Sequence, residues 1–438
     1  MFALLKNKIK IPVINIKDTF SISTISVFIL FLLMLWSMMP WFSWKYKGIG
    51  MIAISCIFIF SRSVTGWKSK FKRTLLITIG FTFLVYSMVR LRNSSGLNDI
   101  INSICPFIVF VFVITMNKIE RKNIVYMSTN IYAWILGISL IAFILVQNGF
   151  PLPYHIITTQ EDRIASYPPF KNYILFINST RSLVVERFRS IFTEPGHLGT
   201  ISALFLFVNK YEIKRKSVLV IFIALLMTVS LSAYVLSFLG YLIYIVANSK
   251  RLYKTVTMIL LFSSVIVTAG YYLSIRYPDN LLNRRILLRL ALDEDKGIAG
   301  NNRTTANFDY YYETQFLTSH QSILFGKKMD ENERYSILSG GNNSYRVFMF
   351  QNGAISMILL FLMYFSIVAV KPSRLGFGLL LLYCISFTQR TQTPLWAMQL
   401  FLFVGAIQCF YDGKHSKLFN DGARRNETKS DILCNNTA

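Results

Sequence analysis

The residues best equipped for chemistry lie in one short stretch, RFRSIFTEPGHLGT, which begins at Arg187. Arg187 and Arg189 precede an apolar run, and Glu194 and His197 lie three residues apart in the first turns of the helix that this run predicts. A guanidinium group binds phosphate oxygens in a bidentate manner, and a carboxylate or imidazole beside it can accept a proton from a hydroxyl. The stretch therefore suits a phosphate-rich ligand and a proton transfer.

A purely structural explanation of the same stretch stays open. Thr193 can cap the first turn, Pro195 fits at the first helical position, and the helix dipole favours Glu194. This explanation does not account for His197 or for the two arginines. Because an ionisable group in the hydrocarbon zone costs about 2.5–3.5 kcal/mol, we interpret the four groups as lining a polar cavity that opens outward. Arg390, near the outer end of a later apolar run, could reach the same cavity.

Apolar helices must position these residues. The chain has 438 residues, of which 53% are hydrophobic and only 15% charged, with a mean hydropathy of +0.46. Runs long enough to cross a bilayer recur along it, which predicts an all-α polytopic integral membrane protein with about twelve transmembrane helices. The predicted spans are about 20–39, 48–64, 74–89, 101–116, 131–147, 193–209, 217–230, 233–247, 255–275, 345–370, 375–388 and 395–411.

The spans divide the chain into blocks. Two long polar segments interrupt them, and loops of this length are uncommon unless they are functional or disordered. The predicted blocks are 1–147 with five helices, the loop 148–192, 193–275 with helices six to nine, the loop 276–344, 345–411 with helices ten to twelve, and the tail 412–438.

The distribution of charge predicts the orientation. The net charge is +25, and the segments on the side of the N-terminus hold 26 Lys and Arg residues against 5 in the short loops of the other side. This bias follows the positive-inside rule, so both ends are expected in the cytoplasm and both long loops outside. The basic character then reports topology and contact with membrane lipid, and it excludes a nucleic-acid partner. The five cysteines have neither metal-ligand spacing nor a disulfide framework.

An outer location limits the chemistry. Cytoplasmic nucleotides do not reach such loops, and the sequence has no phosphate-binding P-loop motif. Arginines beside a base, acting on an activated substrate delivered to the outer face, are the equipment for glycosyl transfer from a lipid diphosphate. In the second loop, Phe308, Tyr312 and Phe316 recur at helical spacing within 303–320. This helix either packs as an ordinary loop helix or turns an aromatic face toward a sugar ring, and the sequence does not separate the two.

The motifs resemble those of a known family. RFRSIFTEPGHLGT is similar to the arginine-rich F-x-E-P-x-x-x-G segment of bacterial O-antigen polymerases of the Wzy type. Arg303, LFGKK (Leu324 to Lys328) and NNSYRVFMFQNGAISMILLF (Asn342 to Phe361) resemble the region that these polymerases share with the O-antigen ligases. In that region Asn343 and Tyr345 match an H-N-x-[YF] segment, and Asn342 stands where ligases usually carry histidine.

The resemblance implies an enzyme of the bacterial cell inner membrane that polymerises undecaprenyl-diphosphate-linked oligosaccharide repeat units into O-antigen or capsular polysaccharide. It implies a glycosyltransferase that needs neither metal nor nucleotide and has no cofactor. A chain-length regulator and a flippase of the same pathway are the partners it suggests. The catalytic residues it implies are Glu194 or His197, near the acceptor hydroxyl, and the substrate-binding residues it implies are Arg187, Arg189, Arg303, Asn343 and Tyr345. Arg390 joins the substrate-binding set through its expected position at the same cavity.

Two alternatives remain. A ligase that transfers finished polymer to lipid A core would share the arginine clamp. A flippase or other transporter would place charges and helix breaks near mid-membrane in both halves of the chain, whereas here the ionisable residues gather at one face.

Overall fold

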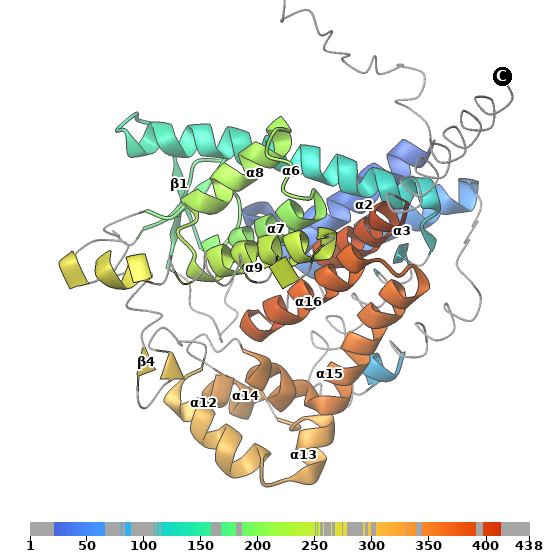
Figure 1. Cartoon of the computed structure of the whole chain (residues 1–438), viewed down its shortest axis with the longest axis vertical. Helices are drawn as coiled ribbons and strands as arrows, with labels where there is room; N and C mark the ends of the chain where they lie inside the picture. The colour runs from blue at the N-terminus through green and yellow to red at the C-terminus, as the bar shows by residue number, and fades with distance from the viewer. Residues whose placement is uncertain are drawn as a thin grey trace, which may run out of the picture.

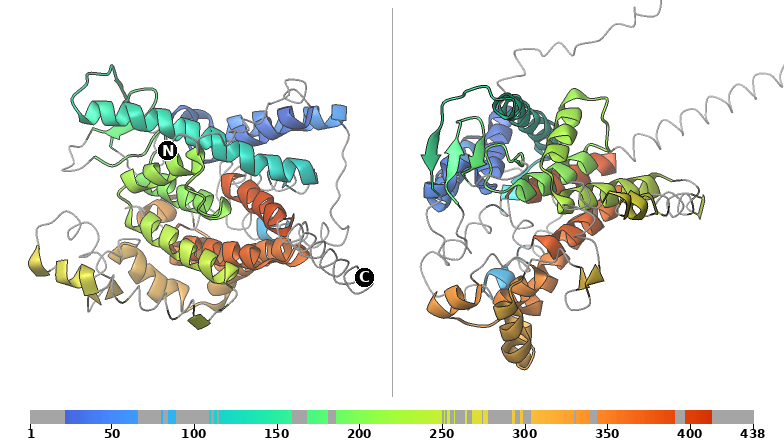
Figure 2. Two further views of the ribbon diagram at one scale, coloured as in Figure 1. Left: turned by 45° about the horizontal axis from the view of Figure 1, so that its top comes forward. Right: turned by 90° about the vertical axis from the view of Figure 1, so that its left-hand side faces the viewer.

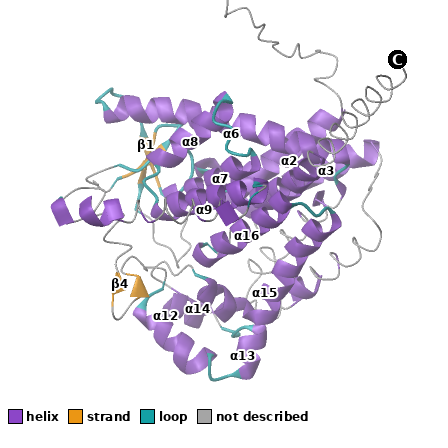
Figure 3. Cartoon of the chain, viewed as in Figure 1, coloured by secondary structure: helices purple, strands orange, loops and turns teal. Residues whose placement is uncertain are grey.

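The described part of the chain is mostly helical, as the computed structural model in Figure 1 and the secondary-structure colouring in Figure 3 show. The structure describes residues 22–65, 80, 84–88, 109, 112–113, 115–158, 168–180, 186–249, 251, 253–254, 257, 264, 268–273, 275–277, 292–293, 297–298, 304–329, 331–338, 344–390 and 397–412.

The helical elements follow the apolar runs of the sequence. The first group consists of α2 (Ile22–Ser37), the 3₁₀ helix η1 (Trp41–Tyr46), α3 (Lys47–Thr65), α6 (Lys118–Gln147), α7 (Pro195–Val208), α8 (Lys216–Met227) and α9 (Leu231–Asn248). The second consists of α12 (Ala306–Tyr311), the π-helix η3 (Tyr312–Phe316), α13 (His320–Phe325), α14 (Glu331–Leu338), α15 (Tyr345–Val370), α16 (Arg374–Gln389) and the helix Ala397–Asp412.

Within the described residues, three helices are long and apolar enough to cross a membrane, namely α6, α9 and α15. Their outward faces are apolar too. On α6, Tyr132, Leu136 and Phe143 are buried, while the exposed face carries Trp134 and Ile141. A helix that is apolar all round is typical of a membrane span or of the core of a large protein, and here the exposed face favours a lipid surrounding.

Several predicted spans coincide with helices, but the predicted count of twelve is not confirmed. The apolar runs at 20–39, 48–64, 345–370, 375–388 and 395–411 correspond to α2, α3, α15, α16 and the helix Ala397–Asp412. Those at 74–89, 101–116 and 255–275 lie largely outside the described residues.

Two helices start at positions other than the predicted span boundaries. The predicted span 131–147 lies inside α6, which begins at Lys118 because Asn117 and Glu120 form a capping box in the polar segment. The Asn117 N–H donates to Glu120 Oε2 at 2.8 Å, and the Glu120 N–H donates to Asn117 Oδ1 at 2.9 Å. The helix expected from Thr193 begins at Pro195, and Glu194 rather than Thr193 occupies the N-cap position.

The described chain is compatible with the predicted all-α class and carries a few short strands in its two long loops. The first long loop contains a three-stranded antiparallel sheet of β1 (His155–Ile157), β2 (Phe170–Asn172) and β3 (Ile177–Ser179), in the order β1-β2-β3. In its register, Ile156 faces Lys171 and Lys171 faces Asn178. The second loop holds a short hairpin of β4 (Leu292–Asp293) and β5 (Gly297–Ile298). Figure 2 shows the larger sheet beside one end of the helical layer.

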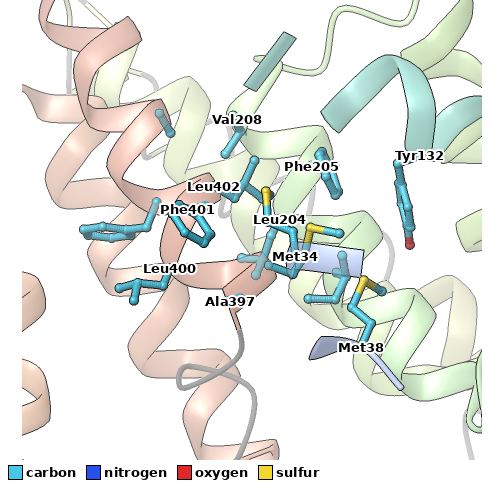
Figure 4. Packing of buried hydrophobic residues seen from close by; sticks show 14 of the residues in the cluster. Met34, Met38, Tyr132, Leu204, Phe205, Val208, Ala397, Leu400, Phe401 and Leu402 are labelled. Atoms are coloured by element: carbon cyan, nitrogen blue, oxygen red, sulfur yellow. The ribbon is translucent and has the colours of Figure 1, made fainter. Parts of the chain in front are cut away.

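One continuous apolar core joins the first group of helices to α15, α16 and the helix Ala397–Asp412. Tyr132 of α6 stacks on Phe205 of α7 with ring centroids 4.7 Å apart. Met34 and Met38 meet side chains of α7 and of the helix Ala397–Asp412 in the same cluster (Figure 4). This packing fixes α7, which carries the candidate site at its first turn, against the middle of the protein.

A smaller lobe forms below this core in Figure 1, from α12, η3, α13 and α14. Phe308, Tyr312 and Phe316 are buried in it, and Phe308 and Phe316 contact Phe350 of α15 with ring centroids 5.4 and 5.6 Å away. Of the two readings of this aromatic stripe, the packed loop helix is therefore the one observed. These rings are not available to a sugar.

Candidate functional site

The segment before α7 is fixed by backbone bonds to three other parts of the chain. The Phe188 N–H donates to Met227 O at 3.0 Å, at the end of α8. The Ser190 carbonyl accepts from Ile177 of β3 at 2.9 Å, and the Ile191 carbonyl accepts from Trp41 at 2.9 Å. Ser190 has a φ of 53°, which lies in the left-handed region that few non-glycine residues adopt. The chain therefore arrives at Glu194 along a defined path.

Glu194 does not cap α7 with its side chain. It is the N-cap residue, in an extended conformation with φ −123° and ψ 134°, and its carboxylate makes no capping bond. Instead, Glu194 Oε2 accepts a charge-assisted hydrogen bond from Arg390 Nη1 at 2.8 Å and lies 3.4 Å from His197 Nε2. The predicted pair of Glu194 and His197 thus shares one helix face, and Arg390 joins it from 196 positions away in the sequence.

Arg390 reaches this position because the second residue of α7 is a glycine, Gly196. The side chain of Arg390 is 5% exposed, and a Cβ added at Gly196 would lie only 2.0 Å from its Nη2 and 2.9 Å from its Cζ. The guanidinium group therefore occupies the space next to the Gly196 backbone, and any larger residue would displace it. The Arg390 backbone N–H caps α16 by donating to Ser386 O at 2.9 Å.

The two arginines of the same segment, Arg187 and Arg189, are each held by a backbone carbonyl group. Arg189 is buried, donates from Nη1 to Thr193 O at 3.2 Å and places its Cζ 5.3 Å from the Phe170 ring centroid. Arg187 is half-buried and donates from Nε to Thr228 O at 3.0 Å, at the end of α8. Both are anchored near the start of α7, and their anchors, Thr193 and Thr228, are contacts that the sequence did not indicate.

Tyr345 begins α15 and is 42% exposed. A turn at residues 371–373 joins α15 to α16, so the start of α15 and the end of α16 lie at the same end of the pair. Phe348 contacts Phe387 with ring centroids 5.1 Å apart, which ties these ends together. Tyr345 and Arg390 are therefore at one end of the bundle. Arg303 and Asn343 lie outside the described residues.

Gly326 of the LFGKK segment and Gly353 of α15 meet backbone to backbone. Gly326 follows α13 with φ 81°, and Gly353 kinks α15 with φ 75°. A Cβ at Gly353 would lie 2.3 Å from Leu324 O, and one at Gly326 would lie 2.5 Å from Gln351 O. The Lys327 N–H donates to Phe350 O at 2.8 Å across this contact. Only glycine allows the approach that locks the lobe onto α15.

An ion pair that the sequence did not predict also holds the lobe to α15. Arg346 Nη1 lies 3.4 Å from Asp309 Oδ1, and the Arg346 Cζ lies 5.5 Å from the Tyr312 ring centroid. Asp309 also accepts a hydrogen bond from Thr304 at 2.9 Å. Thr305 caps α12 by accepting a hydrogen bond from the Phe308 N–H. The sequence around Thr305 did not indicate that Asp309 would pair with Arg346.

The arrangement supplies an ion-paired carboxylate, an imidazole and three arginines around the first turn of α7. Glu194 is 28% and His197 15% exposed, so both are partly open to solvent. Among the residues that the structure describes, no three His, Cys, Asp or Glu side chains gather as they would around a metal ion. The predicted cavity is left untested, since segments 181–185, 339–343 and 391–396, next to the site in the sequence, are outside the described part.

Comparisons of the chain with protein-family models, with curated proteins and with solved structures give no match.

Proposed function

We propose that the chain is a multi-pass glycosyltransferase of the bacterial cytoplasmic membrane that joins oligosaccharide repeat units carried on undecaprenyl diphosphate. In this proposal about twelve helices span the membrane, both ends lie in the cytoplasm, and the start of α7 faces outward. The long apolar helices α6, α9 and α15 and the bias of basic residues to one side support that arrangement.

The observation that carries the proposal is the contact of Arg390 with Glu194 at 2.8 Å, beside His197 at 3.4 Å. Two charged groups from distant helices and a titratable imidazole meet at the site that the motif predicted. A structural helix start needs none of them, because Pro195 already begins α7. A paired base and a guanidinium are the groups that a transfer from a diphosphate leaving group requires.

The reaction distributes roles among these side chains. The acceptor hydroxyl loses its proton to Glu194 or His197, and its oxygen forms a bond to the anomeric carbon of the donor chain. The bond from that carbon to the phosphate oxygen breaks, and the electron pair leaves with undecaprenyl diphosphate. Arg390, Arg187 and Arg189 stabilise the negative charge that develops on the departing phosphate.

Arg390 links binding to base activation in this scheme. In the structure the Arg390 guanidinium donates a hydrogen bond to the Glu194 carboxylate. A diphosphate carries more negative charge than one carboxylate, so it competes for Arg390 and leaves Glu194 to accept the proton.

Deleting the gene and analysing the surface polysaccharide tests the proposal against its alternatives. Loss of a polymerase leaves single repeat units on lipid A core, and loss of a ligase leaves long chains on the undecaprenyl carrier. Loss of a flippase leaves lipid-linked units on the inner leaflet. Only the first result supports the proposal, and complementation with an Arg390→Ala variant that accumulates normally should then fail to restore long chains.

A further inference from the structure

A second group of charges lies at the opposite end of the helical layer. Ser139 of α6 accepts a hydrogen bond from Ser190 at 2.8 Å, so the candidate site lies beside the C-terminal half of α6. Arg121 and its neighbours are in the first turns of the same helix, roughly 27 Å away at 1.5 Å per residue. Lys371 lies at the turn between α15 and α16, at the other end of α16 from Arg390.

Four cations meet the end of the helix Ala397–Asp412 here, three from the start of α6 and one, Lys371, from the turn between α15 and α16. Lys122 Nζ lies 2.7 Å and Lys118 Nζ 3.4 Å from the two oxygens of Asp412. Lys371 donates to Gln408 Oε1 and lies with Nζ 5.6 Å from the Tyr411 ring centroid.

The buried member of the group is Arg121. Its side chain lies in the first turn of α6, where Arg121 Nη2 donates to Met116 O at 2.7 Å. The acidic neighbours are Asp412 and Glu120, and Glu120 is engaged in the capping box. The four cations thus exceed the nearby described carboxylates by two charges.

A small cavity lies between Arg121 and Lys371. Arg121, Lys371 and Gln408 line its polar side, and the apolar side is formed by Ile367, Val370, Val404 and Ile407. Burial, together with the positive charges of Arg121, Lys118 and Lys122, lowers the pKa of Lys371 to about 8. The cluster therefore holds positive charge that a bound anion would stabilise.

We propose that this cluster binds the phosphate head group of an anionic phospholipid, with the phosphate against Lys371 and Lys122. A free phosphate ion would meet the same charges, and the titrations described below separate the two sources. The ends of apolar helices lie at the level of the lipid phosphates in a bilayer, where basic pockets between helices bind such head groups. The inference needs the chain to lie in a membrane, and it does not depend on the glycosyl transfer.

The test uses the purified full-length protein in detergent and titrates it with phosphatidylglycerol, phosphatidylcholine of the same acyl chains, or inorganic phosphate. Binding is read by native mass spectrometry and by the midpoint of thermal unfolding. The variant is Lys122→Gln with Lys371→Gln, and the matched control is Lys214→Gln with Lys216→Gln, two exposed lysines at the start of α8. Lys371→Arg, which keeps the charge, shows whether position 371 tolerates change.

Wild-type protein should bind phosphatidylglycerol in preference to phosphatidylcholine. Each lysine removed from the cluster should weaken that binding by about fivefold, while the control pair and Lys371→Arg retain it. Equal binding of the two lipids, or an equal loss in the control pair, overturns the proposal. Stabilisation by inorganic phosphate as large as that by phosphatidylglycerol would assign the cluster to a water-soluble anion and overturn the lipid assignment.

Discussion

The substitution Gly196→Ala should separate Arg390 from Glu194 without unfolding α7. The added Cβ would lie 2.0 Å from Arg390 Nη2 and 2.9 Å from Cζ. An ordinary non-bonded contact is about 3.5 Å, so Nη2 must retreat by about 1.5 Å. Moving the guanidinium that far stretches the 2.8 Å bond to Glu194 beyond hydrogen-bond range.

The magnitude follows from the bond that is lost. The displaced Arg390 can no longer donate to the departing diphosphate, and a hydrogen bond between charged groups contributes about 1.5–3 kcal/mol, which is about 10- to 150-fold in rate. The backbone of α7 has helical dihedrals after Pro195, and alanine favours a helix over glycine by about 1 kcal/mol. The variant should therefore accumulate like wild type and still extend chains at least about tenfold more slowly.

Two other glycines provide controls. At Gly137 of α6, a Cβ would meet Val220 Cγ1 at 3.6 Å, which is an ordinary contact, so Gly137→Ala should behave like wild type. At Gly199, a Cβ would lie 2.4 Å from Ala233 Cβ, so Gly199→Ala should push α7 from α9 and reduce accumulation. The assay complements a deletion strain, measures polysaccharide length on gels and measures protein by immunoblot. Normal chain length in Gly196→Ala would refute the role assigned to Arg390 on the diphosphate.

Three further substitutions probe separate contacts. Arg187→Lys should restore chain extension poorly, since one ammonium group cannot keep the Nε bond to Thr228 O and also give phosphate a bidentate contact; full activity would point to simple charge. Gly353→Ala should loosen the lobe of α12 to α14 by a few kcal/mol, because it combines φ 75° with a Cβ 2.3 Å from Leu324 O; unchanged limited proteolysis of residues 304–338 would contradict this. Asp309→Asn should lower the free energy of unfolding by less than about 1 kcal/mol, since both partners of its 3.4 Å ion pair with Arg346 are exposed. A larger loss, measured by denaturant unfolding, would show that this ion pair contributes more than an exposed pair.

The sequence predicted the helices through their apolar runs and the chemistry-bearing segment through its charges. It did so because long helices with apolar side chains appear in the sequence as continuous apolar runs. The ends of α2 and α15 lie within two residues of the ends of the predicted runs. The boundary of α6 was missed because the capping box lies in a polar segment, where hydropathy carries no signal. The strand β2 is three residues long, too short for a recognisable alternation.

The geometry of the candidate site depended on contacts that no local pattern encodes. Glu194 and His197 were placed together because a helix brings positions three apart onto one face. Arg390 was associated with them only through its expected side of the membrane, and its actual contact arises from the packing of α16 on α7. The role of Gly196 became visible only once the guanidinium was located beside its backbone.

The most direct test is reconstitution of the purified protein in liposomes that contain undecaprenyl-diphosphate-linked repeat units of the source organism and no nucleotide. The expected result is a ladder of longer chains, with one undecaprenyl diphosphate released for each linkage formed, and no ladder with Glu194→Gln or Arg390→Ala. A wild-type protein that binds these lipids but forms no linkage, or a ladder of normal rate from Arg390→Ala, would contradict glycosyl transfer at this site.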